Sequence, residues 1–415
     1  KYKFIKMATD IKKIGLPEAL AVNEIYKFGG VKSRINNYFS AIPESNYTPG
    51  QIIKLQYPME LIDSRSHSLE FTITGTPATG ATYTRFNKDI RSIISRMVIK
   101  FGGKSVYDTT NQNLLFNIID GTYDYNWEDT AGLIALGTGN ATQRNADFIN
   151  PNRIYSVQLY GLSQEFLNKV LPLNKLQVQM TVELTLADPS VCIETDGTNP
   201  SYVVNNVRMH YASLVPDDNW NNMYNNKVSA GINYNYLSFE NFTTSTLLPA
   251  GTQSSSAILT FRYTSLIAII LVMRPTANIN NLASNDKLNT FDYNNLGVAQ
   301  VKIGGYNQPQ DRQRNVPDSL QMYCETFNLS MRSAFISATN FASTSYVLCI
   351  PLSKHPREWN DSYGSISGIN TSIANNIVFD LQFNTPLAAN MTVDFYALSE
   401  QSVIFNANGS ISWYT

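Results

Sequence analysis

Apolar and polar residues alternate with period two in many short stretches of the chain. The clearest stretch begins at Leu176, and its apolar members are Leu176, Val178, Met180, Val182 and Leu184. Polar residues separate them, so this stretch is predicted to be a strand with one buried face and one face in water. Before it, residues 155–162 are predicted to form another strand. A short helix is then predicted from Gln164 to Val170, which Pro172 would end.

Further strands are predicted wherever such alternation, or a short apolar run, is bounded by turn residues. They cover residues 51–61, 68–74, 90–101, 114–119, 203–214, 233–242, 257–263, 265–273, 298–305, 320–329, 346–353, 376–383 and 392–398. Residues 122–152 and 283–296 are predicted to be long loops. Each half of the chain thus supplies about eight short strands and almost no helical periodicity, which is typical of a β-sandwich or jelly roll.

The order of these predicted strands is repeated. Three pairs of segments correspond at separations of 202, 190 and 185 residues, namely residues 96–103 with 298–305, Val157 with Val347, and Tyr211-Ala212 with Tyr396-Ala397. The pairs occur in the same order in both halves, which indicates an internal duplication with loops of unequal length. A polar interval at 217–231 is the candidate boundary. We therefore predict an N-terminal basic arm and connecting segment at 1–45, a first jelly roll at 46–218 and a second at 219–415.

Composition narrows the possible partners and compartments. With 31 Lys and Arg against 32 Asp and Glu, no net charge directs the chain to nucleic acid or to an anionic membrane. Cys192, Cys324 and Cys349 are too widely spaced for a disulfide framework or a CxxC metal site, which favours a reducing compartment. The apolar run from Leu266 to Met273 is far shorter than the roughly 20 residues of a membrane helix. Since no signal peptide is evident either, we expect assembly inside a cell and no secretion.

The N-terminus has a local excess of positive charge. Its basic residues are Lys1, Lys3, Lys6, Lys12 and Lys13. Such an arm could contact nucleic acid, a membrane face or an acidic partner protein, or it could be a solvated terminus without a partner.

The sequence contains no catalytic, cofactor-binding or metal-binding constellation, so no enzyme activity and no cofactor are expected. His67, His210 and His355 are the only histidines, and none lies in a metal motif. We predict that His210 is packed or hydrogen-bonded within its strand. Cys349 lies in a predicted buried strand, which is unsuitable for a reactive thiolate.

Two local motifs have a structural interpretation that we prefer to a chemical one. Gly103-Lys104-Ser105 ends like a phosphate-binding loop, but Val98 occupies the position of the first glycine, so a β-turn is predicted. Asp120, Asp124, Glu128 and Asp129 could hold calcium, but their spacing fits no standard calcium loop, and a solvated acidic turn is predicted instead.

The segment from Tyr155 to Leu184 resembles the double jelly-roll major capsid proteins of tailless icosahedral double-stranded DNA viruses, most closely those of polinton-like viruses and virophages. In that family a short helix is followed by a Leu-Pro-Leu-like step, as at 171–173, and then by an alternating strand. As an order of elements, the resemblance covers most of Gln51 to Leu398. The second half departs from the pattern because it lacks the Leu-Pro-Leu step. The resemblance implies an all-β fold with two tandem eight-stranded antiparallel jelly rolls and few short helices.

The resemblance also implies a structural role in a virion. The protein would form a homotrimer whose six upright jelly rolls make a pseudo-hexagonal tile of an icosahedral shell. Its partners would be other trimers of the lattice, penton proteins and minor or cement capsid proteins. The long loops would form outer towers or a clasp between subunits. The basic arm would lie on the inner face, where it could contact the genome or an internal membrane.

An alternative function is a two-domain β-sandwich that binds or acts on carbohydrate. Trp127, Trp220 and Trp359 lie in predicted loops and could be stacking platforms for sugar rings. The interpretation that we prefer for these residues is that they are loop anchors packed at a subunit interface.

Overall fold

The computed structural model describes most of the chain between residues 31 and 414. The described ranges are 31–121, 127–159, 170–175, 179–218, 221–222, 225–226, 231–242, 246–284, 287–308, 315–327, 338–352, 368–372, 377–406 and 410–414.

The first half forms two main antiparallel sheets. One sheet has the order β1-β11-β3-β7, with β8 paired to β3, and the other has the order β2-β9-β5-β6. The strands are β1 (Val31–Ser40), β2 (Ile52–Gln56), β3 (Leu61–Thr76), β5 (Ile94–Phe101), β6 (Lys104–Thr110), β7 (Ile154–Val157), β8 (Val170–Pro172), β9 (Met180–Leu186) and β11 (Ser201–Pro216). With the eight main strands numbered along the chain, the two sheets read 1-8-3-6 and 2-7-4-5. This is the strand order of a jelly roll.

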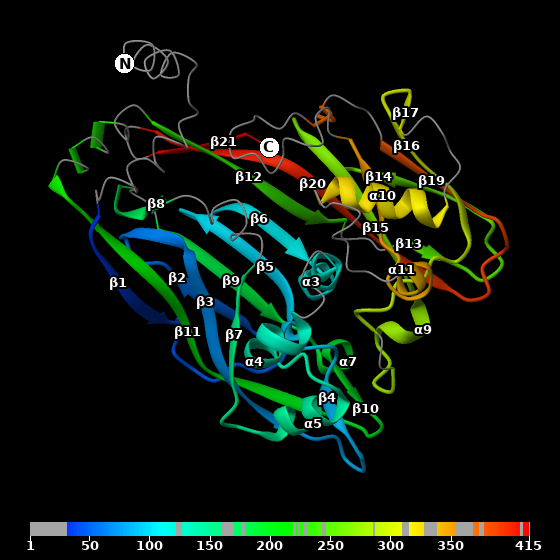
Figure 1. Cartoon of the computed structure of the whole chain (residues 1–415), viewed down its shortest axis with the longest axis horizontal. Helices are drawn as coiled ribbons and strands as arrows, with labels where there is room; N and C mark the ends of the chain where they lie inside the picture. Colours follow the sequence, from blue (N-terminus) through cyan, green and yellow to red (C-terminus); the bar gives the residue numbers. More distant parts are fainter. Residues whose placement is uncertain are drawn as a thin grey trace, which may run out of the picture.

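The second half repeats this order. One sheet is β12-β20-β15-β18, with β13 and β21 paired to β20, and the other is β14-β19-β16-β17. These strands are β12 (Ile232–Asn241), β13 (Thr246–Leu248), β14 (Ser254–Leu259), β15 (Leu266–Pro275), β16 (Leu296–Ile303), β17 (Tyr306–Gln308), β18 (Leu348–Pro351), β19 (Ile377–Phe383), β20 (Met391–Phe405) and β21 (Ile411–Tyr414). The predicted fold class, two tandem jelly rolls, is therefore confirmed (Figure 1).

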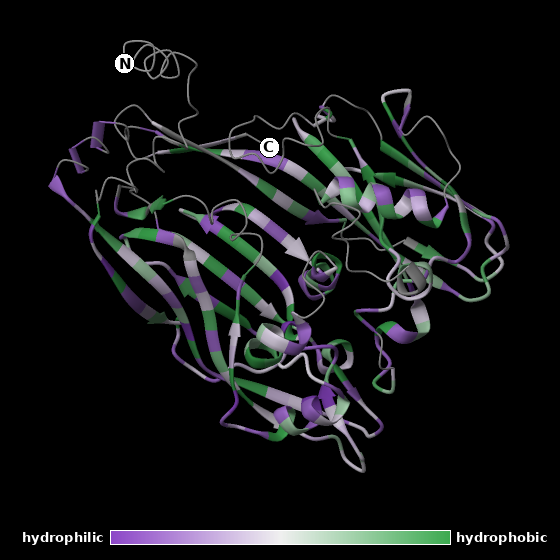
Figure 2. Ribbon diagram, in the orientation of Figure 1, coloured by the Kyte–Doolittle hydropathy of each residue, from purple (hydrophilic) through white to green (hydrophobic). Residues whose placement is uncertain are grey.

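Alternation along the strands places the core as the sequence predicted. In β9, Met180, Val182 and Leu184 are buried and the residues between them are partly exposed. Bands of apolar and polar residues alternate along many strands in Figure 2. The apolar run in β15 is buried throughout, from Leu266 to Met273, as predicted for a strand covered on both faces.

Several predicted elements were wrong in type or extent. The predicted strands at 114–119 and 320–329 are helices α3 (Gln112–Asp120) and α10 (Val316–Thr326) where the structure describes them. Short apolar runs do not distinguish a strand from a buried helix, and both runs follow the fifth strand of their own jelly roll. The predicted loop at 122–152 contains α4 (Leu133–Leu136) and α5 (Ala141–Ile149), and the side chain of Asn140 caps α5.

The N-terminal side also differs from the prediction. Residues 1–45 were expected to be an arm and a connecting segment, but Val31–Ser40 form β1, which pairs with β11 along the edge of the sheet. Residues 164–169 of the predicted helix lie outside the described residues, and Val170 begins β8. Residues 176–178 of the predicted strand also lie outside them, and the described strand is Met180–Leu186.

Successive strands of each jelly roll run in alternate directions, so its connections fall at two opposite ends. One end has the glycine turns at 102–103 and 304–305, each adopting positive φ. The other end has the long excursions, which include α3, β4 (Thr84–Phe86), η1 (Ile90–Ile93), α4, α5, α7 (Pro189–Cys192) and β10 (Ile193–Thr195) in the first half and α9 (Thr276–Ile279), α10 and α11 (Ala338–Ser343) in the second. The end that carries these excursions is called the elaborated end of each jelly roll.

His67 should make stability depend on pH. Burial lowers the pKa of His67 to about 4 from 6.5, and its Nδ1 lies 3.5 Å from the Tyr57 hydroxyl. Between these pH values the unfolded chain binds a proton that the folded chain does not bind, so the free energy of unfolding falls as pH falls from 6.5 to 4. The expected loss is about 3 kcal/mol. The free energy of unfolding, measured by urea titration at several pH values across this range, should fall with pH in the wild type and should change less in His67→Gln. An equal dependence on pH in the two proteins would contradict the assignment.

Candidate functional site

The joint between the two jelly rolls is the candidate functional site, and α3 is its central element. The helix belongs to the first half, between β6 and β7, but its apolar face packs into the core of the second half. The residues of this face are Leu114, Leu115, Ile118 and Ile119. Figure 1 shows α3 between the two groups of strands. At its end the carbonyl of Ile118 accepts a hydrogen bond from the hydroxyl of Tyr323 in α10, at 3.1 Å. The helix therefore contributes side chains of the first half to the core of the second half.

Two strands continue the joint beside α3. The hydroxyl of Tyr236 in β12 donates to the Val106 carbonyl in β6 at 2.7 Å. The hydroxyl of Thr109 in β6 donates to the Phe239 carbonyl in β12. Phe239 packs against the cores of both halves. An edge strand of the first jelly roll thus lies against an edge strand of the second (Figure 1).

A buried ion pair of the second jelly roll also takes part in the joint. Arg274 of β15 contacts the Asp394 carboxylate of β20 through its Nη2 at 2.6 Å, and the side chain of Asp394 is fully buried. The other carboxylate oxygen of Asp394 accepts a hydrogen bond from Asn111 of the first half at 3.2 Å. Asn111 adopts a left-handed conformation just before α3, and its carbonyl accepts the Tyr396 hydroxyl at 2.9 Å. The ion pair therefore fixes the entry of α3 to the second jelly roll.

The elaborated ends of the two halves are joined by a lysine. Lys287, between β15 and β16, is 1% exposed, and its ammonium donates to the carbonyls of Ser190 and Ile193 in the first half. Burial lowers the pKa of Lys287 to about 8. The next amide, of Leu288, donates to Asn87 Oδ1 at 3.2 Å. Part of the predicted loop 283–296 is thus a clasp within the chain.

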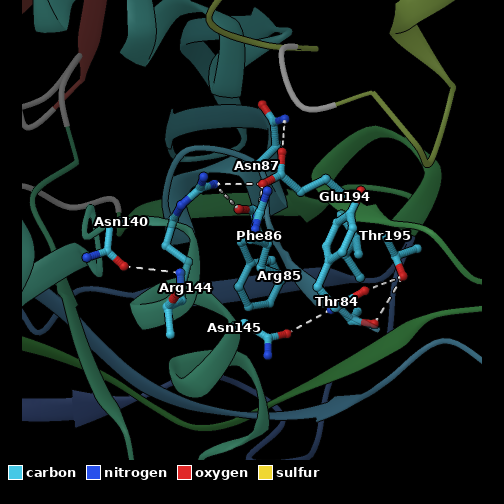
Figure 3. Close-up of polar contacts among 12 residues, drawn as sticks. Thr84, Arg85, Phe86, Asn87, Asn140, Arg144, Asn145, Glu194 and Thr195 are labelled. Atoms are coloured by element: carbon cyan, nitrogen blue, oxygen red, sulfur yellow. Dashed lines mark hydrogen bonds and ion pairs between the residues drawn. The ribbon is translucent and has the colours of Figure 1, made fainter. Parts of the chain in front are cut away.

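Next to this clasp, Glu194 is the centre of a buried polar cluster (Figure 3). Its carboxylate is fully buried and pairs with Arg85 and with Arg144, the latter at 3.1 Å. Asn87 Nδ2 donates to its second oxygen at 3.3 Å. Three excursions supply these groups, namely β4 with the residue after it, α5 and β10, so the cluster ties the elaborated end of the first jelly roll together.

The acidic turn at 120–129 was predicted to be solvated, and for Asp120 this prediction was wrong. The Asp120 side chain is 4% exposed and contacts Arg91 at 2.6 Å and Lys88 at 2.8 Å. These cations lower the pKa of the Asp120 carboxyl against the opposing effect of burial. The guanidinium of Arg91 also lies over the ring of Trp127, 5.2 Å from its centre.

The structure describes only part of the predicted functional residues. Trp127 is half-buried and packs against the first core, while Trp220 and Trp359 lie outside the described residues, as do Lys1, Lys3, Lys6, Lys12 and Lys13. The role of these residues as interface anchors or basic arm stays a prediction. Sequence reasoning missed Glu194, Lys287 and Asp394. Glu194 follows the apolar residues 191–193 and Asp394 interrupts the apolar stretch 393–398, whereas no such signal marks Lys287.

The structure also describes the three cysteines and His210, which the sequence analysis considered as reactive groups. Cys192, Cys324 and Cys349 are free and buried, and burial raises the pKa of the Cys192 thiol to about 12. His210 of β11 lies with its Nε2 3.4 Å from a carboxylate oxygen of Glu70 on the neighbouring strand β3, and its ring is 5.8 Å from that of Tyr38 on β1. The described residues include no group of side chains able to hold a metal ion. Nor do they include a helix long and apolar enough to cross a membrane.

Comparison with known proteins gives matches to solved structures only. No family model and no curated protein matches the sequence. The PBCV-1 protein VP54, fitted into a cryo-EM reconstruction of the virophage Sputnik, aligns with a TM-score of 0.63 and 15% identity over 92% of this chain and 97% of that chain. The Faustovirus major capsid protein aligns with a TM-score of 0.59 and 9% identity over 89% and 90%. The Sputnik virophage structure at 3.5 Å aligns with a TM-score of 0.55 and 13% identity over 92% and 88%. These alignments establish a shared fold over nearly the whole chain. At identities this low they establish the fold alone.

Proposed function

We propose that this chain is a major capsid protein, a structural subunit whose homotrimers tile the icosahedral shell of a virus. The observation that supports this most directly is the parallel alignment of two jelly rolls. Excursions of the first half contact excursions of the second, as in the hydrogen bond from Thr195 N to the Leu282 carbonyl at 2.8 Å. The elaborated ends of both jelly rolls therefore lie on the same side of the subunit. Such polarity suits a tile with an outer and an inner surface.

The joint supports the same proposal. The first jelly roll contributes the apolar face of α3 to the core of the second, whereas independent modules usually meet through smaller and more polar contacts. Two similar but unequal units per chain allow three chains to approach six-fold packing. The fold that this chain shares with VP54 and the Faustovirus major capsid protein is consistent with this role. We propose the division near 217–231 as the boundary between the two units.

Finer parts of the proposal concern partners and location. The protein would be part of the virion, in contact with other trimers, penton proteins and minor capsid proteins, and the N-terminal arm would face the genome or an internal membrane. We propose no enzymatic activity. No comparison supports the carbohydrate alternative, and the guanidinium of Arg91 occupies one face of the Trp127 ring.

The proposal is tested by the oligomeric state. We expect the purified chain of 46.4 kDa to form trimers at micromolar concentration, seen by native mass measurement, and to appear as triangular or hexagonal particles in negative stain. Each interface should bury several thousand Å², the range of obligate assemblies. A stable monomer under these conditions would contradict the proposed function.

A further inference from the structure

Lys287 is a buried cation that no carboxylate neutralises within the part of the chain that the structure describes. Its ammonium donates only to the carbonyls of Ser190 and Ile193. A buried charge without an ion-pair partner is costly, so burial favours the neutral amine. With the pKa of Lys287 lowered to about 8, about one amine in ten is neutral at pH 7. A neutral lysine amine is a nucleophile.

A side-chain amide of the first jelly roll lies within reach of this amine. Asn87 is 1% exposed, and its Oδ1 accepts the backbone amide of Leu288, the residue after Lys287, at 3.2 Å. Bond lengths then place Asn87 Cγ within about 7 Å of Lys287 Cα, and an extended lysine side chain spans about 6 Å. Rotation of the lysine side chain can therefore bring Nζ to Cγ.

The backbone of Asn87 is fixed at the same segment that holds the lysine. Its amide donates to the carbonyl of Cys192 at 2.8 Å, and the carbonyls of Ser190 and Ile193 on either side hold Lys287 Nζ. The segment 190–193 thus keeps the amine and the amide beside each other in a buried part of the joint.

A third group, Glu194, contacts the other end of the amide. Asn87 Nδ2 donates to Glu194 Oε2 at 3.3 Å, and the Glu194 side chain is fully buried (Figure 3). The amide of Leu288 on Oδ1 stabilises negative charge that develops on this oxygen when Cγ is attacked. The carboxylate on Nδ2 can transfer a proton to the leaving nitrogen.

We infer that Lys287 and Asn87 form an isopeptide bond, which joins the two jelly rolls covalently. The neutral amine of Lys287 attacks Asn87 Cγ, and a new bond forms between Nζ and Cγ. Glu194 takes the proton from the attacking nitrogen and passes it to Nδ2, the bond between Cγ and Nδ2 breaks, and ammonia leaves. The products are a secondary amide and ammonia, so the step needs no oxidant and no cofactor. It also converts a buried charge into a neutral group.

Lys88 provides a contrast within the same chain. Its Nζ lies 2.8 Å from an Asp120 oxygen, which is closer contact with a carboxyl than Lys287 makes with any described residue. Against the opposing effect of burial, Asp120 raises the pKa of Lys88, and Arg91 and Lys88 lower the pKa of the Asp120 carboxyl. Both groups therefore stay ionised, and we expect no bond between them.

Mass spectrometry of the full chain tests the bond. The denatured protein should weigh less than its sequence by one ammonia. Trypsin should fail to cleave after Lys287, and a branched peptide should appear in which residues 86–88 are joined to residues 263–302. A bond at Lys88 would instead remove one water, and we expect no such loss.

Two variants separate the bond from other losses of ammonia. Lys287→Arg keeps a cation beside the carbonyls but cannot form the bond, and Asn87→Ala removes the amide, so both should have the full mass of their sequences. Loss of ammonia that persists in Lys287→Arg, or that maps to a linear peptide as a succinimide would, would overturn the inference. Native trimers with the full sequence mass and normal cleavage after Lys287 would also overturn it, and would leave the proposed function intact.

Discussion

Replacing Val182 with Asp is expected to abolish soluble, folded protein. Val182 is fully buried in β9, between β2 and β5 of the first jelly roll. The substitution removes about 1.5–3 kcal/mol of apolar burial. It also buries a carboxylate without a partner, which costs several kcal/mol more. Together these losses approach the whole stability of a typical domain, about 5–15 kcal/mol. Soluble yield and circular dichroism would measure the effect.

The neighbouring residue provides a matched control for this substitution. Thr181 is partly exposed on the other face of β9 and is opposite Lys100. Thr181→Asp introduces the same carboxylate beside a lysine, so we expect soluble protein with a near-normal melting temperature. If Val182→Asp melted like Thr181→Asp, the core position of β9 would be wrong.

Replacing Asp394 with Ala is expected to destabilise the joint between the two jelly rolls by about 3–5 kcal/mol, because a buried guanidinium is left without its carboxylate. Arg274 is 5% exposed and donates to Asp394 through Nε and Nη2. Asn111 also loses its acceptor, so the start of α3 should loosen. Urea unfolding would measure the loss, and hydrogen exchange at α3 would locate it.

An exposed pair in the same half is the matched control. Lys302 and Asp380 lie 2.5 Å apart with side chains 41% and 25% exposed. Asp380→Ala should therefore change the free energy of unfolding by only about 0–1 kcal/mol. The double variant Arg274→Met/Asp394→Leu should recover much of the stability lost in Asp394→Ala, since it removes both charges. Equal losses in Asp394→Ala and Asp380→Ala would show that the buried pair does not hold the joint.

Sequence reasoning succeeded where a residue's neighbours along its own strand determine its environment. The alternation in β9 and the uniformly apolar β15 predicted their burial, because side chains along a strand point to alternate faces. The duplication was also detectable, since repeated strands keep their order even when loops change length. The local pattern did not predict the type of element at α3, which is a helix and not a strand. Its six central residues N-L-L-F-N-I, at 113–118, are compatible with either a strand or a helix, and only the second jelly roll decides which face is buried.

The sequence by itself therefore determined the fold class, the two-fold repeat and the core of most strands, because these depend on spacing along the chain. Only the tertiary structure decided the candidate site. Glu194, Lys287 and Asp394 are unremarkable charged residues in the sequence, and their partners lie 50 to 283 residues away. Glu194 is buried among excursions of the first jelly roll, while Lys287 and Asp394 are buried where the two jelly rolls meet, and this burial makes each partner necessary. The packing of one jelly roll on the other also covers β12 and leaves β1 exposed.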